Sequence, residues 1–276
     1  MNYARKEIIT PVLEDEKTET ETDPRLQAEI QYQLERLLKM QSGKLTPEQL
    51  AKKIAIEHLN LENRADHDEL VAEVLNRRGF INYLDNRLQQ YHRDRQNGRT
   101  AVGSILFIDY DDFKRTNDKY GQAIGDEVLK ATGRLTSRSV RPNDGVGRYS
   151  GGADEFLVFL DGAELDAAVL VADRIRQDIR EVVNEILPQP RDWIQTVSIG
   201  VRSTPSDAEL INYGSREDRR SFIERWIHET NVVTKNSAKV AGKDKIGVMQ
   251  DDGKIQTASI KTVTEGQPPI ITYHDP

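Results

Sequence analysis

Helical patterns alternate with short apolar runs between Asp68 and Met249, and this alternation limits the chain to folds built on a helix-flanked sheet. The apolar runs predict strands at residues 104–108, 146–149, 156–160, 196–201 and 245–249. Longer amphipathic patterns predict helices at residues 75–93, from the first strand to about 140, at 164–183 and at 216–240. Strands that alternate with helices are typical of an α/β or α+β domain.

The segments outside this region have different compositions. Residues 1–22 are acidic with few apolar positions, so we expect a disordered tail. Residues 23–65 hold two amphipathic helical patterns, the second of which starts with a capping-box pattern at Thr46 and Gln49. This N-terminal helical region is expected to serve packing or dimerisation, or alternatively sensing. Residues 250–276 are predicted to form an unstructured polar tail.

The composition narrows the classes of function. The formal net charge is -7, which argues against a protein that binds DNA or RNA through the phosphate backbone. The sequence has no run of about 18 apolar residues and starts with a polar segment, so we expect no membrane span and a cytoplasmic location. Because the chain lacks cysteine, any metal must be held by oxygen or by the five histidines.

Acidic residues follow the first predicted strand. The strand, Ile105–Ile108, ends at Asp109, and Asp111 and Asp112 come just after it. An apolar strand that delivers carboxylates at its C-terminal end is typical of palm-type nucleotidyl transferases, in which the acids hold a metal. On these residues alone, Asp111 or Asp112 could equally cap the next helix.

A second acidic pair follows a glycine turn. Gly151 and Gly152 lie between two predicted strands, and Asp154 and Glu155 come directly before the second strand. The glycines permit a tight turn and the close approach of a base or phosphate. Asp154 and Glu155 can complete a two-metal site with Asp109, whereas a Gly-Gly hairpin alone is only a turn.

Several ordered motifs resemble those of GGDEF diguanylate cyclases at that family's spacing. They occupy residues 109–114, 117–121, 125–129, 148–156, 196–201 and 238–245. The resemblance implies an α+β fold with a palm-like, antiparallel or mixed central sheet of about five strands flanked by helices. This domain is expected at residues 66–249, after the N-terminal helical hairpin.

The resemblance implies roles for the acidic residues. Asp109, Asp154 and the backbone of Tyr110 would hold Mg²⁺ or Mn²⁺, with two ions per active site, and Glu155 would join the acids in catalysis. The ions would activate the 3′-hydroxyl of one GTP and stabilise charge on the α-phosphate of the other. Forming cyclic di-GMP from two equivalent nucleotides requires two facing domains, so activity implies at least a transient homodimer.

A nucleotide site is implied as well. Asn117 and Asp126 would read the guanine edge, whose donors and acceptors match an amide and a carboxylate. The implied phosphate-binding groups are the backbone of Asp112 and Phe113 and the side chains of Lys239 and Lys243. The two lysines lie four residues apart, on one helical face if the helix continues that far. Without the resemblance, Lys239 and Lys243 could equally be ordinary solvent-exposed residues of a helix.

The segment Arg141–Asp144, which reads Arg-Pro-Asn-Asp, stands where the family often carries a product-inhibition site. By the resemblance, Arg141 would pair with a phosphate or guanine of cyclic di-GMP, and Asp144 would orient a base. A four-residue turn with Pro and Asn is an equally good account of the local sequence.

The glycine hairpin departs from the family pattern. Ser150 precedes the glycines and Ala153 follows them, so the loop is two residues longer than the family's. One residue is added on each side, so the flanking strands can keep their facing. An error of about 1 Å in the site can nevertheless cost orders of magnitude in rate.

This departure defines the main alternative function, a degenerate domain that binds GTP or cyclic di-GMP and signals without catalysis. A related cyclase for an adenine-containing dinucleotide is a second alternative, and Asp126 speaks against it. A scaffold without a nucleotide would leave the acids unexplained.

Overall fold

The chain forms two compact units, residues 1–66 and residues 67–276. The computed structural model describes residues 65–149, 154–204, 215–261 and 268–276, together with scattered positions between 28 and 56. The predicted tail at residues 1–22 lies outside the described residues. In the first unit, Thr46 and Gln49 exchange both hydrogen bonds of the predicted capping box. None of the helices in the described ranges is long and apolar enough to cross a membrane.

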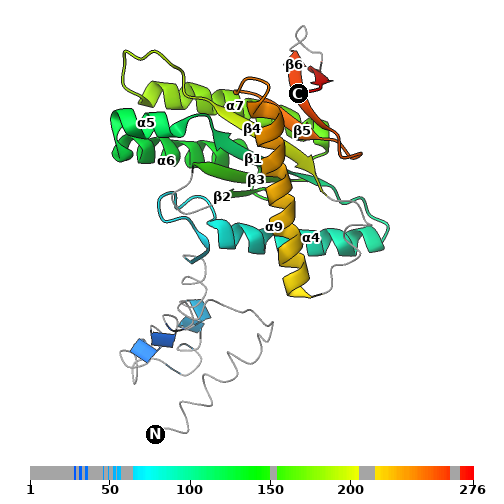
Figure 1. The fold of residues 1–276 in the computed structure, drawn as a ribbon. Coiled ribbons are helices and arrows are strands. Elements are labelled where there is room, and N and C mark those ends of the chain that lie inside the picture. Colours follow the sequence, from blue (N-terminus) through cyan, green and yellow to red (C-terminus); the bar gives the residue numbers. More distant parts are fainter. Residues whose placement is uncertain are drawn as a thin grey trace. The chain divides into compact units, whose positions relative to one another are not determined.

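A mixed seven-stranded sheet forms the centre of the second unit (Figure 1), with the strand order β2-β3-β1-β4-β5-β6-β7. Strands β4 and β5 run parallel, and the other neighbouring pairs run antiparallel. The strands are β1 (Gly103–Tyr110), β2 (Gly145–Arg148), β3 (Glu155–Asp161), β4 (Val197–Ser203), β5 (Ile246–Met249), β6 (Ile255–Lys261) and β7 (Ile270–His274).

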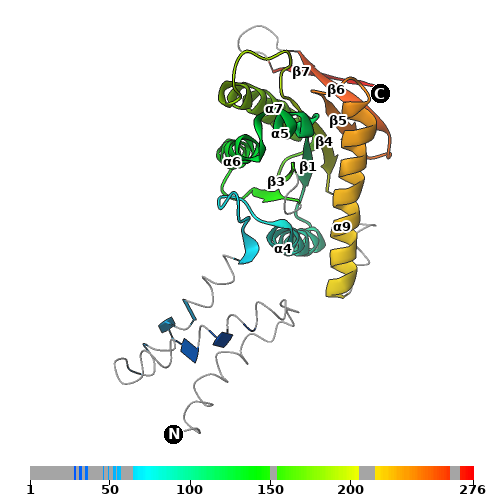
Figure 2. The same cartoon turned by 60° about the vertical axis from the view of Figure 1, so that its left-hand side comes forward.

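Helices cover both faces of this sheet (Figure 2), which confirms the predicted α+β class. Helices α6 and α7 pack on one face, and α4 and α9 pack on the other. A π-helical segment, η1, continues α9 and packs against β4 and β5. The helical bounds are α4 (Arg77–Gln96), α5 (Phe113–Tyr120), α6 (Gln122–Ser139), α7 (Leu165–Ile186), α9 (Arg216–Val233) and η1 (Thr234–Lys239).

Strand β1 is buried on both faces, and its side chains alternate between two cores. Leu106 and Ile108 pack in the core under α6 and α7, whereas Ile105 and Phe107 pack in the core under α4 and α9. A strand that is covered on both faces reads as a continuous apolar run, because no position faces water. This burial fixes the end of β1, where Asp109 lies.

The C-terminal segment contradicts its prediction. Residues 250–276 were expected to be unstructured, yet β6 and β7 extend the sheet through this segment, so seven strands form instead of about five. The chain reverses after β5 in a turn at Asp251–Gly253, where Gly253 has a φ of 81°. Ala258 of β6 is buried against the core. Short strands at the margin of a sheet gain their stability from pairing and from one-sided packing, which leaves only a weak pattern in the sequence.

Two helical predictions also differ in detail. The helix expected from β1 to about residue 140 is two helices, because the chain turns at Gly121 with a φ of 82° between α5 and α6. The helix expected at residues 216–240 is α-helical to Val233 and then π-helical to Lys239. The chain leaves the helix after η1, so Lys243 does not share a helical face with Lys239.

Asp161, at the end of β3, ties α4 to the sheet. Its carboxylate accepts hydrogen bonds from the Arg87 guanidinium and, at 2.5 Å, from the Tyr91 hydroxyl. Burial raises the pKa of Asp161, but the hydrogen bonds from Arg87 and Tyr91 outweigh it, so the pKa lies below its ordinary value. A carboxyl with a lowered folded-state pKa stabilises the fold above its unfolded-state pKa, and this stability is lost as the pH falls through the folded-state pKa.

We predict that Asp161→Asn lowers the free energy of unfolding at neutral pH by about 2 kcal/mol, because Arg87 loses its charged partner. The difference from wild type should shrink as the pH falls from about 4, the unfolded-state pKa of an Asp, through the lower folded-state pKa, because Asp161 is then protonated in both states. Urea unfolding at several pH values measures this difference, with Glu181→Gln, an exposed acid of α7, as the control. A difference that is independent of pH would contradict the assignment.

Candidate functional site

Three predicted acids lie near the C-terminal end of β1, one on that strand and two at the start of β3. Asp109 pairs directly with Glu155 of β3 in the sheet register, so both side chains lie on the same face of the sheet. Asp154 precedes Glu155. Burial, and then the nearby negative charge of Asp109, raise the pKa of both Asp154 and Glu155. Carboxylates at this spacing favour a bound cation, which would offset their mutual repulsion.

Lys239 supplies a positive charge at this cluster. Its ammonium nitrogen lies 2.9 Å from Oδ2 of Asp109 and donates at 3.0 Å to the carbonyl oxygen of Tyr110. These are two of the three groups that the sequence resemblance assigns to the metal. The Asp109 carboxylate oxygen and the Tyr110 carbonyl oxygen therefore both contact one cationic group. Such oxygen atoms are also the ligands that Mg²⁺ and Mn²⁺ prefer. In the ranges that the structure describes, no three acidic or histidine side chains converge as a ready-made metal cluster.

Asp111 lies beside this cluster, with its Oδ1 4.0 Å from the ammonium nitrogen of Lys239, and it has a structural role. Its carboxylate accepts hydrogen bonds from the hydroxyls of Thr196 (2.8 Å) and Ser198 (2.9 Å) and from the backbone N–H of Asp244 (3.0 Å). Asp112 is the N-cap residue of α5 but makes no side-chain capping hydrogen bond. The alternative that one of these two acids serves only to cap the helix is therefore wrong.

The predicted phosphate-binding groups lie together beside the acids. Asp112 and Phe113 form the start of α5, and the ammonium of Lys243 lies 2.5 Å from the Asp112 carboxylate. This hydrogen bond is the main cause that lowers the pKa of Asp112. Lys239 approaches from η1 on the same side of β1. Two lysines and a helix N-terminus thus converge at the end of the strand, although the lysines come from a helix and a turn rather than from one helical face.

The predicted guanine-reading residues also lie close together, on neighbouring helices. Asn117 lies on α5 and Asp126 on α6. The side chain of Asn117 lies against Gly125, where an added Cβ would be 2.0 Å from its Oδ1. Gly125 therefore leaves the space that brings the Asn117 amide next to Asp126. Both side chains are half-exposed, as a base-binding pair must be.

The Arg141–Asp144 segment forms a turn at the opposite end of β2 from these acids. The Asp144 carboxylate accepts hydrogen bonds from the backbone N–H groups of Arg141 (2.7 Å) and Asp161 (2.8 Å). Asp144 therefore shapes the turn, which supports the turn interpretation. Arg141 is exposed and lines a hollow of about 310 Å³ with Tyr83 and neighbouring residues. Gly151 and Gly152 lie outside the described residues.

The sequence patterns missed two glycines that position Lys239. The segment η1 crosses β4 at Gly200 and β5 at Gly247. A Cβ at Gly200 would lie 2.5 Å from the carbonyl oxygen of Thr230, and one at Gly247 would lie 2.8 Å from that of Val233. Only glycines allow this close approach of helix to sheet, which brings Lys239 over Asp109. Gly200 and Gly247 are register partners on neighbouring strands but lie far apart in the sequence, so no local pattern signals this role.

Comparison with known proteins defines the family. Residues 65–214 match the family model described as "Diguanylate cyclase, GGDEF domain", which covers more than half of the chain. The chain belongs to the GGDEF family. The GGDEF domain includes β1 to β4 and the acids at the end of β1.

Named relatives share this GGDEF domain but are longer proteins. Diguanylate cyclase A of Treponema denticola is 41% identical over 106 residues, which are 38% of this chain and 28% of the relative. Diguanylate cyclase DgcM of Escherichia coli K12 is 38% identical over 141 residues, which are 51% of this chain and 31% of the relative. The chain thus matches less than a third of the length of either relative.

A solved structure supports the fold. The coiled coil and GGDEF domain of DgcB from Caulobacter crescentus, in complex with c-di-GMP, superposes with a TM-score of 0.56. The match covers 78% of this chain and 98% of that chain at 18% sequence identity. At this identity the likeness shows the GGDEF fold alone.

We predict that Gly200→Ala lowers the free energy of unfolding by about 2 kcal/mol, because the added methyl group forces η1 away from the sheet. Urea unfolding tests this loss against Ser203→Ala on the same strand, which should change stability by less than about 0.5 kcal/mol. Equal stability of Gly200→Ala and the control would show that η1 does not depend on this contact.

Proposed function

We propose that this chain is a diguanylate cyclase, which condenses two GTP into cyclic di-GMP and releases two pyrophosphates. The observation that carries the proposal is the cation-binding end of β1, where Asp109 and the carbonyl oxygen of Tyr110 both contact the ammonium of Lys239. Membership of the GGDEF family and two relatives named diguanylate cyclases support this function.

The acids fit a divalent metal. Asp109, Asp154 and the Tyr110 carbonyl would hold Mg²⁺ or Mn²⁺, with two ions per active site, and Glu155 faces Asp109 across the strand pair. When bound, the metal supplies a Lewis acid that lowers the pKa of the attacking 3′-hydroxyl and stabilises charge on the α-phosphate. Asp109 and Glu155 come from rigid strands, so their carboxylates need little reorganisation.

The remaining residues bind and orient GTP. Lys239, Lys243 and the backbone at Asp112 and Phe113 neutralise and hydrogen-bond the phosphates. On the side of α5 and α6, Asn117 and Asp126 bind the guanine edge, and the carboxylate of Asp126 favours guanine over adenine by accepting from its N1 and N2 groups.

Two copies are needed for the reaction. Each domain holds one GTP, and ring closure requires each 3′-hydroxyl to reach the α-phosphate of the opposite nucleotide. We therefore propose a homodimer that is at least transient, with the N-terminal helical region as the segment that arranges it. Arg141 is proposed to bind the product cyclic di-GMP at its exposed turn, while Asp144 holds that turn in shape.

A second candidate function is a binding module that has lost catalysis. The observation that favours it is the hairpin between β2 and β3, which is two residues longer than the family pattern and directly precedes Asp154. In this case the groups at α5, α6 and η1 would still bind GTP or cyclic di-GMP. The domain would then signal by binding the nucleotide, without catalysis.

Product analysis separates the two functions. Purified protein with radiolabelled GTP and Mg²⁺ should form cyclic di-GMP, and Asp109→Asn should lower the rate by about a hundredfold or more, because a preorganised charge at the reacting atoms is lost. Asp118→Asn, which alters an exposed acid on the same side of the sheet, should leave the rate unchanged. If wild type binds GTP but forms no cyclic dinucleotide, the chain is a binding module and the cyclase proposal fails.

A further inference from the structure

Backbone strain in the described part of the chain is concentrated at the proposed phosphate site. Three non-glycine residues there have left-handed φ angles: Asp112 (57°), Lys243 (63°) and Asp244 (50°). Such conformations cost about 1–3 kcal/mol each, so they persist only where surrounding contacts hold them. Asp112 belongs to the turn between β1 and α5, the first turn. Lys243 and Asp244 belong to the turn between η1 and β5, the second turn. The two turns face each other, since the Lys243 ammonium lies 2.5 Å from the Asp112 carboxylate.

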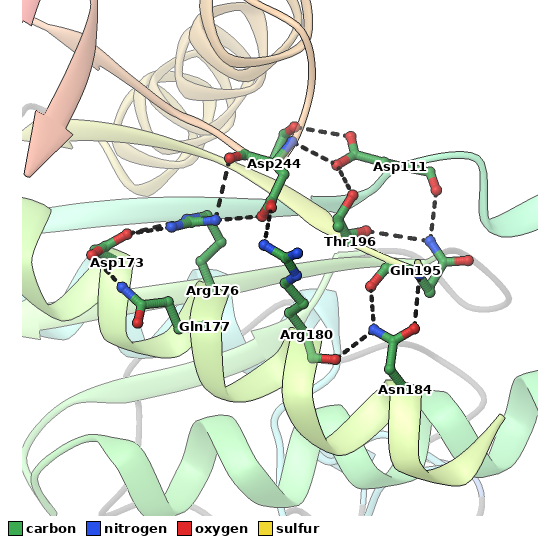
Figure 3. Close-up of polar contacts among 10 residues, drawn as sticks. Asp111, Asp173, Arg176, Gln177, Arg180, Asn184, Gln195, Thr196 and Asp244 are labelled. Carbon is green, nitrogen blue, oxygen red and sulfur yellow. Dashed lines mark hydrogen bonds and ion pairs between the residues drawn. The ribbon is translucent and has the colours of Figure 1, made fainter. Parts of the chain in front are cut away.

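Asp111 connects these two turns (Figure 3). Its side chain holds the backbone N–H of Asp244 at 3.0 Å, next to Lys243 in the second turn. Its own backbone N–H donates to the carbonyl oxygen of Thr196 at 2.9 Å, and its carbonyl oxygen accepts from Gln195 at 2.6 Å. The backbone of Asp111 therefore fixes the first turn to the residues before β4, and its side chain fixes the second turn to the first.

Helix α7 braces the second turn through two arginines. Arg176 hydrogen-bonds both the carboxylate and the carbonyl oxygen of Asp244, and Arg180 reaches the other carboxylate oxygen at 2.9 Å (Figure 3). Arg176 is in turn held by Asp173, one turn earlier on α7, at 2.7 Å. The two arginines and two aspartates balance in charge, so this group adds little net attraction for phosphate and acts through geometry.

The same helix also braces the first turn. Asn184 of α7 holds both backbone groups of Gln195, at 3.0 and 2.8 Å. The fully buried side chain of Gln195 then bonds the Asp111 carbonyl and the hydroxyl of Thr116 on α5. Both turns that carry phosphate-binding groups are thus tied to one rigid helix.

We propose that Arg176 is a positioning residue for the triphosphate of the nucleotide, acting through Asp244 on the turn that carries Lys243. The proposal rests on the function proposed above. The pair Arg176–Asp244, called the brace below, contacts the second turn, which carries Lys243. The guanine-reading residues Asn117 and Asp126 lie elsewhere, on α5 and α6. Loss of Arg176 therefore weakens binding of the triphosphate and spares binding of the base.

The test compares two ligands by calorimetry in the presence of Mg²⁺. The first is a GTP analogue with a methylene group between its α- and β-phosphorus atoms, which cannot release pyrophosphate, and the second is GMP. Arg176→Met keeps the aliphatic stem but removes the donors. We expect it to bind the analogue about tenfold more weakly than wild type, since a displaced lysine loses its phosphate contact, while affinity for GMP changes by less than about twofold.

Matched variants separate positioning from loss of folding. Arg174→Met removes an exposed arginine of the same helix that contacts the Ser139 carbonyl, outside the brace, and should change neither affinity. Arg180→Met removes the more exposed of the two arginines on Asp244 and should weaken the analogue less than Arg176→Met does. Asp244→Asn combined with Arg176→Met should be no weaker than Arg176→Met alone, because both act on one contact.

Two results would overturn the inference. Equal weakening of the analogue and GMP by Arg176→Met would mean a general structural role, and additive effects of the two substitutions would mean that Arg176 does not act through Asp244. If wild-type protein binds neither the analogue nor GMP, the proposed function itself fails. This outcome can be told apart from failure of the inference, because it is seen with the wild-type protein alone.

Discussion

The double burial of β1 is the constraint on which the rest of this structure depends. Packing on both faces leaves the strand no freedom to shift, so Asp109 near its end stays in fixed register with Glu155 and Ser198 of the neighbouring strands. After Tyr110, the last residue of β1, the chain leaves the sheet and enters a left-handed turn at Asp112. The core beneath this strand end fixes the backbone, and ion pairs such as Lys239–Asp109 and Lys243–Asp112 then join the charged side chains.

Around this strand end, distant parts of the sequence meet through close packing. Gly200 and Gly247 let η1 lie on the sheet and bring Lys239 to Asp109. Gly125 makes the same kind of space for Asn117 between α5 and α6. Helix α7 holds the two strained turns through Arg176, which bonds Asp244, and Asn184, which bonds Gln195. The site is therefore a product of the whole domain, which is typical of palm-like sheets whose chemistry lies at the strand ends.

Much of this arrangement could be predicted from the sequence. The apolar run at residues 105–108 gave the strand, and the ordered motifs after it indicated the family and the groups that the structure brings together at Asp109 and Asn117. Local patterns could not show that the Asp111 carboxylate bonds Thr196, Ser198 and the backbone of Asp244, because these partners lie at least 85 residues further along the chain. They also could not show β6 and β7, since β6 forms by pairing with β5 and β7 by pairing with β6.

The proposed function requires Asp109 and Asp154 to hold the same metal although the hairpin before Asp154 is longer. Electron paramagnetic resonance of Mn²⁺, titrated into the protein with a non-reacting GTP analogue, measures this directly. We predict that Asp109→Asn and Asp154→Asn each weaken Mn²⁺ binding by at least about tenfold, with no further loss in the double variant. Binding of Mn²⁺ by Asp154→Asn as tight as by wild type would contradict the claim and would favour a nucleotide-binding module.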